Sequence, residues 1–189
     1  MRFKLTCRAA EGKSPIIKSL SIQSMVHLRL LAKEELILIQ RIAHQTWPST
    51  FAGLLSKAQI DYMLNWMYDL KMLESQVEQG HGFLVAEEDG AAVGFAGYEF
   101  NHLAGSMAKL HKLYLLPSSQ GKGVGKALLL EVAKRAREAG QKSLVLNVNK
   151  YNEKAINFYI AMGFVTIRQE VNDIGQGYVM DDDVMELSL

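Results

Sequence analysis

The chain has 189 residues, 49% of them apolar, and its 21 basic and 20 acidic residues leave a net charge of +1. This balance argues against a nucleic-acid partner, which usually requires a basic surplus. The single cysteine, Cys7, excludes an internal disulfide and a zinc site built from thiolates, and no apolar run approaches the ~18 residues of a membrane span.

The N-terminal half predicts a strand followed by helices. Residues 1–22 carry no periodicity and no apolar signal segment, so we treat them as an extension of a cytoplasmic protein and place the domain at 23–189. The patterns predict a strand over 25–31, a helix over 32–46 that Trp47 and Pro48 end, a helix from a Ser56 cap to Met67, and a short helix over 70–79.

The C-terminal half alternates strands and helices within one α/β (α+β) domain. The patterns predict a hairpin of strands 83–87 and 92–100, a strand over 108–116, a helix over 121–139, a strand over 143–148, a helix over 152–162, and strands over 164–172 and 178–188. These elements fit one domain with a sizeable core.

A glycine-rich turn stands between the strand at 108–116 and the helix after it. A P-loop does not fit, because Gln120 occupies the first glycine position and Ala127 replaces the hydroxyl residue. The dinucleotide code fails as well, since its third glycine falls on Lys126 or Leu128. What remains is Gln-x-x-Gly-x-Gly, at Gln120, Gly123 and Gly125, before a helix N-terminus suited to phosphate.

A second segment, LVLNVNKYNEKAINFYIAMGF, runs from Leu144 to Phe164. It places Asn152, Ala155 and Tyr159 on one helix face and ends the helix at Gly163. Together, the two segments resemble the acyl-CoA loop and the second motif of the GCN5-related N-acetyltransferases (GNAT family). More narrowly, the chain is similar to the bacterial polyamine acetyltransferases of the sporulation-regulator type.

The resemblance implies a single mixed, mostly antiparallel sheet of six to seven strands with helices on both faces. It also implies acetyl-CoA as cosubstrate, without a metal. Main-chain groups of a splayed strand and the loop amides would hold acetyl-CoA, together with the second motif; the residues are Leu113, Tyr114, Leu115, Gln120, Gly121, Lys122, Gly123, Val124, Gly125, Lys126, Asn152, Ala155 and Tyr159. The lysines at 109, 112, 122 and 126 form a basic patch matched to one phosphorylated cofactor.

Acetyl transfer to an amine requires an acid and a base. Tyr159 is the candidate acid, because a phenol with a pKa near ~10 stays protonated at neutral pH. The base is either His111, which strand alternation places on the face of Leu113 and Leu115, or Glu99 at the end of the preceding strand.

The acceptor is expected to be a small-molecule amine such as a polyamine. Candidate lining residues are aromatic (Trp47, Phe51, Tyr62, Trp66, Tyr178), and Asp181, Asp182 and Asp183 near a hairpin turn are the candidate anions for a cationic amine. The alternatives are a protein or peptide acceptor and a non-catalytic CoA-binding regulator. A homodimer through the C-terminal strands is compatible with the pattern.

Overall fold

The computed structural model describes residues 26–189, so the expected extension at 1–22 and the start of the first predicted strand lie outside it. Strands and helices appear in the predicted order. They are β1 (His27–Leu30), α1 (Leu36–Thr50), α2 (Lys57–Met67), α3 (Leu70–Glu78), β2 (Gly82–Glu88), β3 (Ala91–Glu99), β4 (Met107–Leu115), α4 (Val124–Glu138), β5 (Ser143–Asn149), α5 (Glu153–Ala161), β6 (Val165–Gly175) and β7 (Tyr178–Ser188), with 3-10 turns η1 (Lys33–Glu35), η2 (His102–Ala104) and η3 (Pro117–Ser119).

The strands form one seven-stranded sheet, in the order β1-β2-β3-β4-β5-β7-β6. Neighbouring strands run antiparallel except β4 and β5, which are parallel. The mixed, mostly antiparallel sheet and the helices on both faces confirm the predicted fold class. Across residues 26–189, the structure contains no helix that is both long and apolar enough to cross a bilayer.

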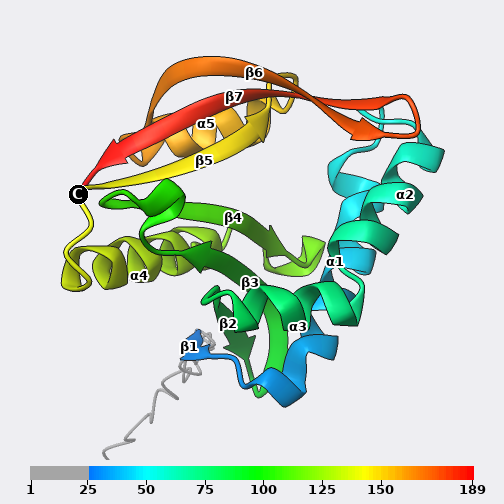
Figure 1. Cartoon of the computed structure of the whole chain (residues 1–189). Coiled ribbons are helices and arrows are strands. Elements are labelled where there is room, and N and C mark those ends of the chain that lie inside the picture. Colours follow the sequence, from blue (N-terminus) through cyan, green and yellow to red (C-terminus); the bar gives the residue numbers. More distant parts are fainter. Residues whose placement is uncertain (1–25) are drawn as a thin grey trace, which may run out of the picture.

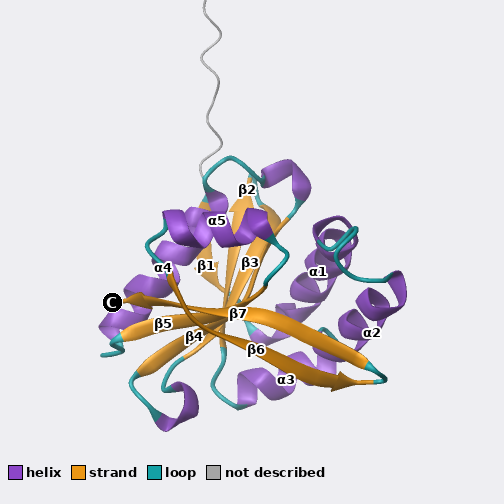
Figure 2. Cartoon of the chain, turned by 90° about the horizontal axis from the view of Figure 1, so that it is seen from above, coloured by secondary structure: helices purple, strands orange, loops and turns teal. Residues whose placement is uncertain are grey.

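The two faces of the sheet bury separate cores. Helices α1–α3 cover one face, and Ile39, Trp47 and Tyr68 pack there against Phe95 of β3. Helix α4 covers the other face through residues such as Leu128, and α5 lies beside the β5 end of that face. Figures 1 and 2 show α1–α3 on one side and α4 and α5 on the other.

The helix boundaries test two capping predictions. Ser56 caps α2 as predicted, since its hydroxyl oxygen accepts a hydrogen bond from the amide of Gln59 at 3.1 Å. The predicted end of α1 at Trp47-Pro48 is wrong, because the helix continues to Thr50. Pro48 lies in the last turn, where its missing N–H removes a single helical bond, and buried Trp47 still accepts from the amide of Phe51 at 3.0 Å.

Strand β4 has two irregularities that shape the site. Its parallel pairing with β5 joins residues 107–110 to 143–146 and stops there, so the edge of β4 from Leu113 onward is unpaired toward β5 within the described residues. On the other edge, Gly97 pairs with Lys112 while Tyr98 pairs with Leu110. His111 is therefore the extra residue of a β-bulge, a feature that re-aims side chains.

Candidate active site

The glycine turn leads from β4 into the N-terminus of α4. The helix begins at Val124, three residues later than predicted, because Gly121 and Gly123 adopt left-handed conformations with φ of +75° and +86°. Gly123 is the N-cap residue and supplies no side chain to the first turn. The free amides of that turn and the positive end of the helix dipole thus face outward, as a phosphate group requires.

Polar side chains from other elements hold this turn. Gln120 donates to the carbonyl of Leu115 at 3.3 Å and accepts from Lys154 of α5 at 2.7 Å. Glu88, at the end of β2, accepts from the Ser119 hydroxyl at 3.0 Å and lies 3.5 Å from the ammonium of Lys122. Glu88 was not identified from the sequence, since it lies more than thirty residues earlier in the chain.

The predicted cofactor residues of β4 divide between the two faces. Leu113 and Leu115 are half-buried against the core beneath α4. Tyr114 points the other way, into the aromatic group around Trp47, with ring centroids 5.7 Å apart. Main-chain atoms of these three residues are available at the unpaired edge.

Helix α5 presents the second motif beside that edge. Asn152 caps it, because its side-chain oxygen accepts from the amide of Ala155 at 3.2 Å. The ring of Tyr159 packs between Phe158 and Phe164, with centroids 5.2 and 5.6 Å away. Burial raises the pKa of the Tyr159 phenol, so it stays protonated at neutral pH.

The two rival bases contact each other. Glu99 Oε1 lies 3.4 Å from His111 Nε2, Glu99 Oε2 lies 2.9 Å from His81 Nε2, and His102 Nδ1 also contacts Oε1. The rings of His81 and His111 stack with centroids 4.7 Å apart. Glu99 is therefore the centre of an imidazole cluster, whereas an isolated carboxylate at a strand end is usually solvated.

Burial sets the charge of this cluster. It lowers the pKa of His111 to about 3, with a smaller contribution from Lys112, and it also lowers the pKa of His81. Burial by itself would raise the pKa of Glu99, but His111, His102 and His81 outweigh it and lower that pKa. Two half-buried imidazoles are thus neutral at pH 7 beside an ionised carboxylate, and a proton taken up here belongs to the cluster as a unit.

The predicted face of His111 is wrong. Leu113 and Leu115 pack beneath α4, whereas His111 turns toward α3 and lines a hollow of about 240 Å³. The bulge at His111 interrupts the alternation on which the prediction depended. The hollow is bounded by aromatic, thioether, amide and basic side chains: Trp66, Met67, Met72, Gln76, Gln79, His81, His111 and Lys112.

Lys112 does not belong to the predicted basic patch at the glycine turn. It is buried on the α3 side, where its ammonium donates to Gln76 at 3.0 Å and lies 5.5 Å from the ring centroid of Tyr68. Burial lowers the pKa of Lys112 to about 8. Lys122 and Lys126 remain at the turn, both exposed.

The aromatic residues proposed to line the acceptor cleft form two groups. Trp47 and Phe51 are buried in the core, 1% and 9% exposed, and cannot line a cleft. Tyr62 stacks with Trp66 at a centroid distance of 6.1 Å and contacts Tyr178 in a tilted arrangement at 5.6 Å, where α2 meets the tip of the β6–β7 hairpin (Figure 1).

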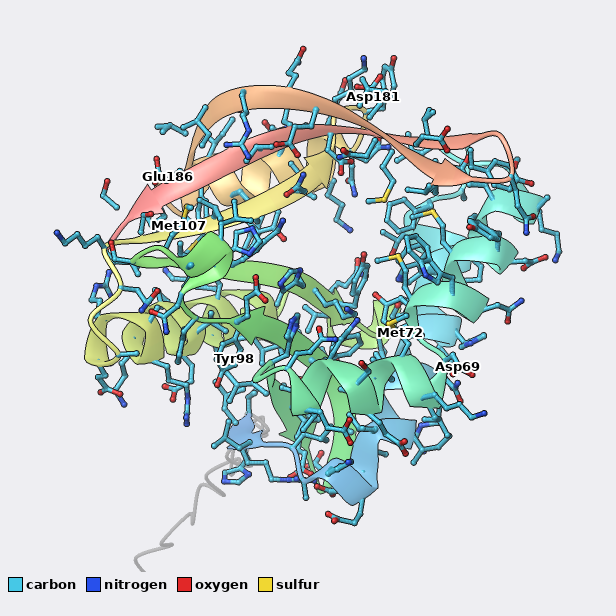
Figure 3. All side chains as sticks on the ribbon, in the orientation of Figure 1. Asp69, Met72, Tyr98, Met107, Asp181 and Glu186 are labelled. Atoms are coloured by element: carbon cyan, nitrogen blue, oxygen red, sulfur yellow. The ribbon has the colours of Figure 1, made fainter. Side chains whose placement is uncertain are left out.

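The three aspartates lie within β7 rather than near its turn, so that part of the prediction is wrong. Asp181 pairs with Lys150, and Figure 3 shows it on the outer side of the hairpin. Asp183 accepts from Gln169 at 2.9 Å. Asp182 is 3% exposed and shares the face of Met180, which packs with the core of α1–α3. Burial raises its pKa to about 6.

Besides Glu88, the sequence also did not reveal two residues of the cluster around Glu99, His81 and His102. His81 precedes β2 and His102 lies in η2, so neither belongs to a motif of fixed spacing. The position of His102 depends on buried Gln141, which accepts from the amide of Asn101 and donates to its side chain, both at 2.9 Å.

The site fits a phosphorylated thioester. The turn offers the α4 amides, the open edge of β4 offers main-chain groups, and Gly121 and Gly123 have nothing within 4 Å of an added Cβ, so a ligand can approach the backbone. Acid and base candidates lie on opposite sides of β4, with Tyr159 on the α4 side and His111 on the α3 side.

Comparison with known proteins agrees with this geometry. Residues 39–164 match the acetyltransferase (GNAT) family. A spermidine N(1)-acetyltransferase of Thermoplasma acidophilum is 28% identical over 144 residues, covering 74% of this chain and 88% of that one. The L-amino acid N-acyltransferase MnaT of Escherichia coli is 30% identical over 98 residues, covering 51% and 57%.

Solved structures show the same fold. The PaiA N-acetyltransferase of T. acidophilum in complex with coenzyme A superposes with a TM-score of 0.73 and 27% identity, covering 87% of this chain and 99% of that one. The ribosomal-protein-S18-alanine N-acetyltransferase of E. coli shares the fold alone, with a TM-score of 0.66 and 19% identity over 87% and 94% of the two chains.

Proposed function

The chain belongs to the GNAT family of acetyltransferases and is an acyl-CoA-dependent N-acyltransferase, and we propose that it acetylates a small-molecule primary amine, with a polyamine as the first candidate. One observation carries this proposal. The unpaired edge of β4 stands beside the amides of α4, while His111, which contacts Glu99, lines a hollow on the other side of the same strand.

The donor side would be held by main-chain groups. We assign the amides from Gln120 to Lys126 to the pyrophosphate and the open edge at 113–115 to the acyl arm. Bound acetyl-CoA supplies an acetyl group that its thioester has already activated. Asn152 and Ala155 sit at the start of α5, where the arm would pass.

The acceptor side must remove a proton from the amine. A protonated amine entering the hollow meets His111 and His81, with the carboxylate of Glu99 directly behind them. We assign the proton to this cluster, in which His111 relays it and Glu99 carries the compensating negative charge. Tyr159, kept protonated by burial, would donate to the departing sulfur from the other face.

A polyamine is supported by a relative and by the charge of the sheet face. The T. acidophilum relative is a spermidine N(1)-acetyltransferase. Glu99 and Asp182 place two carboxyl groups on the α1–α3 face of the sheet, and Glu170 accepts from Asn147 at 3.2 Å beside Asp182. Anions on one face attract a chain with several cationic amines.

The first test is acceptor-dependent thiol release from acetyl-CoA, with polyamines, amino acids, aminoglycosides and basic peptides as acceptors. Turnover with polyamines and little with the rest is the expected result. Preference for peptides would replace the small-molecule proposal with a protein acceptor. Tight CoA binding without turnover on any acceptor would favour a non-catalytic regulator.

A matched pair of variants tests the anionic face. Asp182→Asn should raise KM for spermidine, while Asp183→Asn, on the neighbouring residue that pairs with Gln169, should leave KM unchanged. Equal KM values in both variants and the wild type would count against a role for Asp182 in polyamine binding.

A free amino acid is the second candidate acceptor, because of Lys112. A buried ammonium that lines the hollow attracts a carboxylate and repels a polyamine, and MnaT is named an L-amino acid N-acyltransferase. Lys112→Met should abolish amino-acid turnover and spare polyamine turnover if both occur.

The cytoplasmic location and the homodimer stay predictions, which cell fractionation and sedimentation would test.

A further inference from the structure

Three of the five histidines in the chain converge on one carboxylate. We propose that His81, Glu99 and His111 bind one divalent cation of the Zn²⁺ class. The ligand atoms of the first three residues all lie within 4.8 Å of one another. Zn²⁺ binds imidazole nitrogen and carboxylate oxygen at about 2.0–2.2 Å, so two ligands of one ion lie about 3–4 Å apart.

The two separations that involve Glu99 meet that requirement. His81 Nε2 lies 2.9 Å from Glu99 Oε2, and His111 Nε2 lies 3.4 Å from Glu99 Oε1. Glu99 comes from the end of β3 and His111 from the bulge of β4, which are hydrogen-bonded neighbours in the sheet, and His81 immediately precedes β2, the other neighbour of β3. Rigid elements of this kind hold donor atoms in place better than loops do.

Three buried side-chain polar atoms in residues 26–189 lack a hydrogen-bond partner, and besides Trp47 Nε1 and the Tyr68 hydroxyl oxygen they include one atom of this cluster. His111 Nε2 is inaccessible to solvent and makes no hydrogen bond among the described residues, because its approach to Glu99 is poorly aligned. A buried polar atom without a partner costs about 1–3 kcal/mol. A cation between His111 and Glu99 would satisfy this nitrogen and the carboxylate together.

The donor set selects the class of metal. Imidazoles favour Zn²⁺ and its neighbours, whereas Ca²⁺ and Mg²⁺ favour sites of oxygen ligands. The single carboxylate offsets part of the charge, and the nearby ammonium of Lys112 is directed to Gln76 of α3. His81 and His111 line the hollow, which gives an ion a path to the site.

A bound cation would affect catalysis, and this consequence rests on the proposed function. The ion would occupy the lone pairs of His111 and Glu99 that the proposed base needs. Zn²⁺ should then inhibit acetyl transfer, and a chelator should restore it. Binding of the ion itself does not depend on whether the base is assigned correctly.

The test is titration of the full-length, chelator-treated protein with Zn²⁺, by calorimetry and by competition with a chromophoric chelator. We expect one equivalent in the wild type and an affinity at least roughly tenfold weaker in His81→Gln and in the nearly isosteric Glu99→Gln. His44→Gln, on the exposed side of α1, and Cys7→Ser should bind as the wild type does.

Cobalt gives a readout that is independent of activity. Co²⁺ in a site of nitrogen and oxygen ligands should give visible absorption bands that His81→Gln loses while its circular dichroism stays that of the wild type. No saturable Zn²⁺ binding, or binding that Cys7→Ser abolishes and Glu99→Gln retains, would overturn the proposal. Either result would overturn only the metal site. The proposed function would still be tested separately, by measuring acetyl transfer in the presence of chelator.

Discussion

Tyr159 is the residue where the acid assignment can be isolated. Its hydroxyl is the only group that Tyr159→Phe removes, and the ring contacts with Phe158 and Phe164 persist. Because acid catalysis typically contributes ~10²–10⁴-fold, kcat should fall about 100-fold or more while the affinity for CoA is retained. Steady-state kinetics and calorimetry measure the two effects separately.

Tyr151→Phe is the matched control for that variant. Tyr151 precedes the same helix, is 60% exposed and should tolerate the loss of its hydroxyl. Full activity in Tyr159→Phe would remove the acid role and leave Tyr159 as a packing residue of α5.

Asp182 is the residue where stability and function oppose each other. Its pKa rises from 3.8 to about 6 on folding, so the folded protein binds a proton more tightly than the unfolded chain does. Below pH 3.8, Asp182 is protonated in both the folded and the unfolded state, so its pKa shift does not reduce the free energy of unfolding. That free energy falls as the pH rises from 3.8 to about 6. Two pKa units correspond to at most about 3 kcal/mol.

Asp182→Asn should therefore raise the free energy of unfolding at pH 8 by about 1–3 kcal/mol and leave it nearly unchanged at pH 4. Urea unfolding at the two pH values measures this difference, with Asp183→Asn as the control. A lower free energy of unfolding of Asp182→Asn at pH 8 would show that the carboxylate of Asp182 makes contacts that offset the energetic cost of its burial. Stabilisation joined to a raised KM for spermidine is the expected pattern for a functional residue.

Among the elements, α4 has a glycine at each end, so a substitution in the glycine turn before the helix can be compared with the same substitution after it. Gly123 and Gly140 precede and follow the helix with φ of +86° and +76°, and neither has an atom within 4 Å of an added Cβ. Alanine at either position should cost about 1 kcal/mol, because a side chain is strained in the left-handed region. Only Gly123→Ala should also raise KM for acetyl-CoA, since its Cβ lies beside the free amides of α4.

Thermal unfolding and acetyl-CoA kinetics of the two variants provide this comparison. The same rise of KM in Gly140→Ala would mean that helix strain, rather than access to the turn, controls cofactor affinity.

Local signals made most elements predictable, and the misses have a common physical origin. The helix predicted over 152–162 and the hairpin predicted from strands 83–87 and 92–100 depend on neighbours in sequence, and both were predicted correctly. The bulge at His111 depends on the register between β3 and β4, which no local pattern encodes, so the face of His111 was predicted wrongly. Expecting no metal came from the resemblance, and the cysteine count excludes only thiolate sites.

Tertiary contacts likewise explain the acceptor side. Trp47 has the same helical spacing as a cleft residue, but it packs against Tyr68 and Tyr114. Tyr68 follows α2 and Tyr114 belongs to β4. Conversely, Tyr62 reaches the hairpin because its hydroxyl donates to the carbonyl of Ile174, 2.6 Å away and 112 residues later. The spacing of aromatic residues along a helix cannot distinguish a residue that packs in the core, such as Trp47, from one that reaches the hairpin, such as Tyr62.

At the scale of the whole molecule, the sheet consists of two halves joined at β4 and β5. Four residue pairs, from 107–110 and 143–146, make that junction, and the strands diverge beyond it. A ligand that fills the divergence would contact β4 on one side and the segment of β5 and α5 on the other. CoA should therefore stabilise the halves as one unit and not merely order the glycine turn.

At 100 times its dissociation constant, CoA should add about 2.7 kcal/mol to the free energy of unfolding. For a chain of this size that corresponds to a rise in Tm of about 5–10 °C. Hydrogen exchange should show new protection at 113–116 and at 147–149, the residues that border the divergence. Adenosine 3′,5′-bisphosphate, which lacks the pantetheine arm, is the control and should protect neither segment. Protection by CoA that is confined to the turn at 120–126 would mean that the divergence of β4 and β5 is not where the acyl arm binds.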